Sequence, residues 1–126
     1  MGYFIIKAQL PSLNQYVRAC KAGKHQGNEF KKEIEELIGW SIRQYQASGK
    51  LSPMENTPCR VHIDWHEATK RRDVDNIQSA QKFILDALQN CGILKNDSRR
   101  FVKQIHHLIV DDKEDYVVVR LEKYES

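Results

Sequence analysis

The chain has 126 residues, of which 40% are hydrophobic and 29% are charged. These fractions are ordinary for a globular protein and argue against extensive disorder, and the length predicts a single domain over residues 1–126. No apolar run approaches the roughly 20 residues that a membrane-spanning helix requires. The formal net charge of +3 permits binding to nucleic acid without requiring it, so the positions of the charges matter more than their sum.

The N-terminus and the cysteines both bear on the compartment. The first ten residues, MGYFIIKAQL, contain neither a basic leader nor a small-residue cleavage site, so they predict a first strand rather than a signal peptide. Cys20, Cys59 and Cys91 are scattered and include no CxxC pair, so we expect neither a zinc ribbon nor a disulfide framework. Both features favour a cytoplasmic location.

The first half of the chain predicts a strand, a loop and a helix. Residues 3–7 are rich in β-formers and precede a Pro-Ser turn. Residues 11–27 show no steady periodicity, which predicts a loop. Asn28 can cap a helix, because the apolar residues that follow it recur at helical spacing. These residues are Phe30, Ile34, Leu37, Ile38, Ile42 and Tyr45.

The second half begins with an alternation of apolar and polar residues over positions 60–66, which is typical of a strand with one buried face. A second helix is predicted to start at Asp75 as its cap, with Gln78 completing a capping box. Gly92 is the expected stop of this helix. Two apolar helix faces are therefore separated by one strand.

Two further strands, at residues 105–110 and 117–121, close the predicted chain. The predicted order of elements is β-α-β-α-β-β. Two helices packed on one face of a mixed β-sheet would bury both apolar stripes, so the sequence predicts an α+β fold.

The run Asp73-Val74-Asp75-Asn76 is the sharpest local feature. Residues two apart in an extended segment point the same way, so Asp73 and Asp75 can present their carboxylates together. Mg2+ prefers hard oxygen ligands and usually takes one or two carboxylates with waters and substrate phosphate. A cation would also relieve the repulsion between two close carboxylates. The alternative is a capping turn with one extra surface acid.

Cations surround these acids. Lys70, Arg71 and Arg72 come directly before the aspartate pair and could hold phosphate oxygens, although a solvated strand end would have the same composition. Lys82 lies seven residues after Asp75, so two helical turns bring it to nearly the same face. There it could stabilise charge on a phosphate, or it could form an exposed pair with an acid one turn later.

A third acid, Asp97, lies in the segment Lys95-Asn96-Asp97-Ser98-Arg99-Arg100. Taken alone, it is typical of a turn aspartate beside a short helical piece. Two arginines follow it closely, as three cations precede the first pair of acids.

Together these residues resemble the RusA family of Holliday junction resolvases. Family members show an Arg-Asp-x-Asp-Asn start, a helix with a lysine before an Asp-Ala-Leu segment, and an acidic pair beyond it. The resemblance covers most of the chain, with residues 15–58 contributing least. The runs that carry it are Pro11-Ser12-Leu13-Asn14, Arg72-Asp73-Val74-Asp75-Asn76, Lys82-Phe83-Ile84-Leu85-Asp86-Ala87-Leu88 and Gly92-Ile93-Leu94-Lys95-Asn96-Asp97.

The resemblance implies a homodimeric, Mg2+-dependent endodeoxyribonuclease of bacteria or their phages that cuts symmetrically across four-way DNA junctions in recombination and repair. It implies Asp73, Asp75 and Asp97 as the catalytic, metal-binding acids and Lys82 as the catalytic lysine. Mn2+ can replace Mg2+ at such ligands. The residues expected to position the DNA backbone are Lys70, Arg71, Arg72, Arg99 and Arg100.

The sequence departs from the family pattern at two places. Many members place the lysine four residues after the second aspartate, whereas Lys82 follows Asp75 by seven. The acidic pair is Asn96-Asp97 rather than Asp-Asp, which keeps the second and essential acid of the family.

Two alternatives stay open at this point: a non-catalytic branched-DNA-binding protein of the same fold, and a nuclease that acts on forks or flaps. A single substitution at the first aspartate would separate catalysis from binding. Comparison of junction, fork and linear substrates would identify the DNA structure that is cut.

Overall fold

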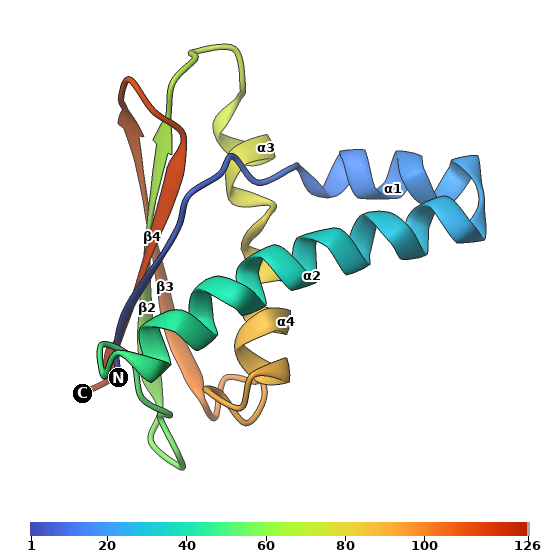
Figure 1. Ribbon diagram of the computed structural model, residues 1–126. Coiled ribbons are helices and arrows are strands. Elements are labelled where there is room, and N and C mark those ends of the chain that lie inside the picture. The colour runs from blue at the N-terminus through green and yellow to red at the C-terminus, as the bar shows by residue number, and fades with distance from the viewer. Residues whose placement is uncertain (126) are drawn as a thin grey trace.

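The computed structural model describes residues 1–125, which form a four-stranded mixed sheet with helices on one face (Figure 1). The strands are β1 (Gly2–Ile6), β2 (Cys59–Glu67), β3 (Val102–Asp111) and β4 (Tyr116–Lys123). Their order in the sheet is β1-β4-β2-β3. β4 runs antiparallel to both neighbours, whereas β2 and β3 are parallel. The predicted α+β fold with a mixed sheet is confirmed.

Both predicted helices are present, but the second is divided into two, and a further helix precedes the first. The helices are α1 (Leu13–Ala22), α2 (Lys24–Ala47), α3 (Val74–Gln78) and α4 (Gln81–Asn90). Figure 1 shows α2 and α4 against the sheet, while α1 and the first part of α2 extend away from it as a hairpin. Within residues 1–125, no helix is long and apolar enough to cross a membrane.

The core lies between the sheet and the helices α2 and α4. Val61, Ile63 and Trp65 of β2 are buried, and the residues between them are half-buried. This is the alternation that a sheet covered on one face produces. Ile38 of α2 and Ile84 of α4 are fully buried against that face.

The predicted loop at residues 11–27 is wrong, because most of it is the helix α1. Ser12 caps this helix: its hydroxyl accepts from the backbone N–H of Gln15, and the Gln15 side chain accepts from the backbone N–H of Ser12. This reciprocal pair is a capping box that the sequence carried in the form Ser-x-x-Gln. α2 consequently begins at Lys24 and not at Asn28. The apolar residues of α1 show only weak helical periodicity, because this helix buries no residue completely.

The predicted start of the second helix is also wrong. Asp73, not Asp75, occupies the N-cap position, with extended backbone angles of φ −71° and ψ 155°. Its side chain accepts no capping hydrogen bond within the described residues, so the predicted capping box is absent as well. Asp75 lies in the first helical turn, where a negative charge is favoured by the helix dipole. Both carboxylates thus remain free of structural bonds to the helix end.

A histidine links the sheet to the start of α4. The indole N–H of Trp65 donates to Nδ1 of His107 at 2.9 Å, and Nε2 of His107 lies 2.9 Å from Oε1 of Gln81. Burial lowers the pKa of His107, and the neighbouring His106 lowers it further. The ring is therefore held neutral, with Nε2 as its donor to Gln81. This bond fixes the first residue of α4 relative to β2 and β3.

Candidate active site

The exposed aspartates Asp73 and Asp75 stand where α3 meets the start of α1. The backbone N–H of Leu13 donates to Oγ of Ser79 at 3.0 Å. The amide of Asn14 lies 3.5 Å from the side-chain oxygen of Asn76. The start of α1 is therefore part of the surface that carries the two aspartates. The Pro-Ser-Leu-Asn run had no assigned role, although its place among the family motifs was a usable signal.

Arg72 ties three separate segments together just before this surface. Its Nη1 donates to the backbone carbonyl of Leu10 at 2.7 Å. Its Nε lies 3.4 Å from Oε1 of Glu67, an ion-pair contact without hydrogen-bond geometry. Gln9 also reaches this carboxylate, at 3.4 Å. Arg72 was expected to bind DNA; in this structure its guanidinium contacts Leu10 and Glu67, so the residue is not the solvated strand end that was the alternative.

Glu67 is an unusual partner because it is only 4% exposed. Burial raises the pKa of its carboxyl group, while the charge of Arg72 acts in the opposite direction. Asp115 adds a smaller upward contribution to the pKa of Glu67, and the bond from Gln9 a small downward one. The charge of Arg72 is therefore the main influence that favours the ionised form of this buried carboxyl group at the end of β2.

The remaining two cations of the basic run are exposed. Neither Lys70 nor Arg71 has an ion-pair or side-chain hydrogen-bond partner within residues 1–125. Both therefore remain open to solvent just before Asp73 in the chain.

Asp97 lies apart from the other two acids. It follows α4, whose ten residues span about 15 Å, and its loop lies at the end of α4 opposite α3 (Figure 1). Asn96, not Asp97, makes the local turn, since its side-chain oxygen accepts from the backbone N–H of Ser98 at 2.9 Å. Across residues 1–125, no three His, Cys, Asp or Glu residues gather into a metal-binding group. One chain does not assemble the expected cluster.

Lys82 is engaged with an acid of its own helix. Its Nζ lies 3.3 Å from Oδ1 of Asp86, and its side chain is 59% exposed. The pair lines a groove of about 300 Å³ between α2 and α4, beside a second pair formed by Lys31 and Glu35. The exposed Lys82–Asp86 pair was the alternative to a catalytic role, and it is the arrangement present here.

The longer spacing between Asp75 and Lys82 coincides with the junction of α3 and α4. Ser79 and Ala80 keep near-helical angles but end one helix and begin the next. Ser79 occupies the position, four residues after Asp75, where many family members carry lysine. Its hydroxyl instead accepts from Leu13 and donates to the carbonyl of Asn76. The longer spacing therefore spans the interruption between α3 and α4 and not one continuous helix.

Comparison with known families decides the identity of the chain. The family model described as "Endodeoxyribonuclease RusA" matches residues 3–122. The chain belongs to the RusA family. It is accordingly a Holliday junction endodeoxyribonuclease, and the resemblance drawn from its sequence motifs is confirmed. No curated protein matches the chain at a significant level.

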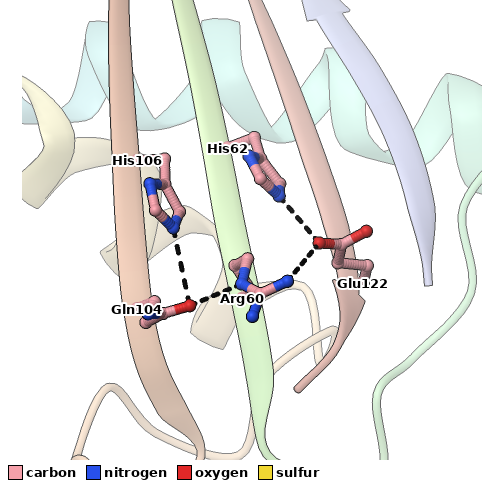
Figure 2. Close-up of polar contacts among 5 residues, drawn as sticks. All are labelled: Arg60, His62, Gln104, His106 and Glu122. Carbon is pink, nitrogen blue, oxygen red and sulfur yellow. Dashed lines mark hydrogen bonds and ion pairs between the residues drawn. The ribbon is translucent and has the colours of Figure 1, made fainter. Parts of the chain in front are cut away.

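The RusA-family chain also carries a polar network on the face of the sheet that the helices leave open. Figure 2 shows Glu122 between Arg60 and His62. Its Oε1 lies 3.0 Å from Nη1 of Arg60 and 2.9 Å from Nε2 of His62. His106 stacks on His62 with ring centroids 5.1 Å apart, and Gln104 accepts from Arg60. These bonds lower the pKa of Glu122. The network lies on the opposite side of the sheet from α3 and the aspartates, and its polar groups bond one another.

The last two predicted DNA-binding residues belong to the Asp97 loop. Arg99 and Arg100 are exposed, and the guanidinium of Arg100 lies 5.4 Å from the ring centroid of Phe101. Phe101 is itself buried, so it anchors the loop where β3 begins. The two arginines therefore accompany Asp97 rather than the first two acids.

Replacing Arg72 with methionine should lower the free energy of unfolding by about 3 kcal/mol at pH 7, because it leaves a buried carboxylate unpaired. The pKa of Glu67 should then rise further above that of the unfolded chain. Ionised Glu67 would destabilise the variant above this pKa, and the penalty would fade as the pH approaches the ordinary glutamate value of about 4.3. Urea unfolding at pH 7 and pH 5 should show a smaller loss at pH 5.

The double variant Arg72→Met/Glu67→Gln is the matched control, since it has no carboxylate to titrate. Its difference in unfolding free energy from the wild type should lack this response to pH. An Arg72→Met loss of equal size at both pH values would show that the ion pair is not its cause.

Proposed function

We propose that the chain cleaves branched DNA with Mg2+ held at Asp73 and Asp75, acting as a homodimer in recombination and repair. The observation that carries this proposal is the pair of exposed carboxylates at the start of α3, on a backbone anchored by Arg72. We place the activity in the cytoplasm of a bacterial cell, or of one infected by phage, and treat residues 1–126 as one nuclease domain.

The donor set fits a hydrated hard cation. Mg2+ commonly takes one or two carboxylates and fills its other positions with waters and phosphate oxygens, and both carboxylates here are exposed to solvent. When bound, the ion lowers the pKa of a water and neutralises charge on the phosphoryl oxygens, and Mn2+ can take its place. Lys70 and Arg71 then position the scissile strand through its phosphates.

A dimer is supported by the separation of Asp97 from the first two acids. Because α4 stands between them, a single chain holds Asp97 away from Asp73 and Asp75. We propose that Asp97 of the partner subunit completes the site across a two-fold axis. A four-way junction has approximate two-fold symmetry, so a C2 dimer offers one such site to each of two strands. Arg99 and Arg100 would then approach the substrate together with Asp97.

Lys82 retains its proposed role only if it exchanges partners. In the DNA complex, its ammonium would leave Asp86 for a phosphate oxygen, where it would stabilise the negative charge that develops during cleavage. The exchange costs little, because an exposed pair of this spacing contributes only about 0.3–0.5 kcal/mol.

Asp73→Asn should abolish Mg2+-dependent cleavage of a synthetic four-way junction and leave its binding within about threefold of the wild type. The substitution removes a metal-binding charge but keeps the shape of the side chain. Cleavage gels and gel-shift titrations in EDTA measure the two properties separately, with linear duplex and fork substrates run in parallel. Cleavage at the wild-type rate by this variant would refute the site, and cleavage of the fork alone would refute the junction as substrate.

Mixing two inactive variants should restore cleavage if the site is shared between subunits. In a heterodimer of Asp73→Asn and Asp97→Asn chains, one composite site receives both substitutions and the other receives neither. The mixture should therefore nick one strand of the junction, at up to about half the wild-type rate per heterodimer. The Asp73→Asn/Asp75→Asn mixture is the control and should stay inactive. No activity in either mixture would place all three acids in one subunit.

Lys82→Ala should lower the cleavage rate at saturating protein by about a hundredfold, as removal of one charge-stabilising donor does in other sites. Its exposed position predicts a change in unfolding free energy below about 0.5 kcal/mol. Asp86→Asn is the companion variant, because it frees the ammonium and should leave the rate unchanged or raise it. Equal cleavage rates for Lys82→Ala and the wild type would show that Lys82 has no catalytic role.

A further inference from the structure

The outer face of α1 carries a stripe of exposed polar and basic residues. Asn14, Arg18 and Lys21 follow one another at spacings of four and three residues, which places them on one side of the helix. All three are exposed. Tyr16 and Cys20 lie on the opposite side of α1, where they pack against α2.

This stripe belongs to a segment of a single charge sign. No Asp or Glu occurs before Glu29, so the first 28 residues contain only cations among their charged side chains. Lys24, the first residue of α2, lies just beyond the end of α1 and is also exposed. Within residues 1–125, the side chains of Arg18, Lys21 and Lys24 have no ion-pair partner, unlike Lys31 and Lys82. A charged surface without internal partners is suited to an anionic ligand.

The stripe starts at the proposed site. Asn14, its first member, lies 3.5 Å from Asn76, the residue after Asp75. From there α1 leads away from the sheet toward the turn with α2 (Figure 1). Its ten residues span about 15 Å, and successive phosphates of one DNA strand advance about 3.4 Å along the duplex axis. The helix therefore matches the length of about four nucleotides next to the aspartates.

The hairpin of α1 and α2 is built as a stiff support. The ring of Tyr16 packs 6.0 Å from Phe30 of α2 and 5.9 Å from Phe83 of α4. Gly27 lets the helices meet closely, because a Cβ at that position would lie 2.8 Å from the sulfur of Cys20. A support held in this way keeps its cations at fixed positions and reduces the entropy lost when DNA binds.

We infer that the outer face of α1, with Lys24 at its end, is a rail for the phosphate backbone of the DNA arm that leads away from the cleaved phosphate. The inference rests on the proposed function, since it takes the aspartates as the cleavage centre. Arg18, Lys21 and Lys24 contact phosphates, so they add affinity without reading the base sequence. Asn14 connects the rail to the cleavage centre and sets the register between them.

The test removes three charges from the rail and three from elsewhere. The rail variant is Arg18→Gln/Lys21→Gln/Lys24→Gln, and the matched control is Arg43→Gln/Lys50→Gln/Lys123→Gln. The control residues lie in the last turns of α2, just after α2, and at the end of β4. Binding to a synthetic four-way junction in EDTA is measured from 50 to 300 mM NaCl, after circular dichroism has shown both variants to be folded.

The slope of log K for junction binding against log salt concentration should become less negative by about 2–3 in the rail variant. Each lost phosphate contact removes roughly 0.9 from the size of this slope. Affinity near physiological salt should fall on the order of ten- to a hundredfold. The control should keep the wild-type slope. Equal changes in both variants would overturn the rail, since affinity would then follow net charge alone.

A second measurement locates the contact. The wild type should bind more weakly to a junction with three neutral methylphosphonates in the arm beside the cleavage point than to the unmodified junction. The rail variant should bind both junctions with the same affinity. If the modification also lowered the affinity of the rail variant, those phosphates would contact another part of the protein. Both measurements read binding without cleavage, so they stay decisive if Asp73→Asn retains activity and the proposed cleavage centre fails.

Discussion

The contact between Arg72 and the buried carboxylate of Glu67 holds together the segments that carry the proposed cleavage site. Glu67 ends β2, and Arg72 directly precedes Asp73 at the N-cap position of α3. The same guanidinium binds the carbonyl of Leu10, two residues before the cap of α1. A buried carboxylate without this partner would be costly, so three chain segments are fixed relative to one another by one charged group.

The described surfaces divide into regions with different chemistry. The end of the helical layer near α3 carries exposed carboxylates and unpaired cations, as a site for a metal and a phosphate requires. The open face of the sheet carries charges that satisfy one another, as Glu122 does with Arg60 and His62. The loop of Asp97 lies at the far end of α4. In one copy of this RusA-family chain, Asp97 is therefore separated from the exposed pair Asp73 and Asp75.

The junction of α3 and α4 bears on the position of the lysine. A straight helix would carry Lys82 around to the face of Asp75 and keep it about 10 Å along the axis. The helix is instead interrupted at Ser79, whose hydroxyl bonds to the backbone of α1 and of Asn76. Lys82 then lies beside α2 and pairs with Asp86. The segment between Asp75 and Lys82 therefore includes a residue, Ser79, that bonds to the start of α1.

The sequence by itself determined the strands, the α+β class, the family and the exposed aspartate pair, because alternation of apolar residues and short motifs are local properties of the chain. It missed α1, although Ser12 and Gln15 carried its cap, since that helix buries only part of one side. The partner of Arg72 and the separation of Asp97 from Asp73 were decided by the tertiary structure. Each depends on segments more than four residues apart coming together, and sequence spacing carries no distance of that kind.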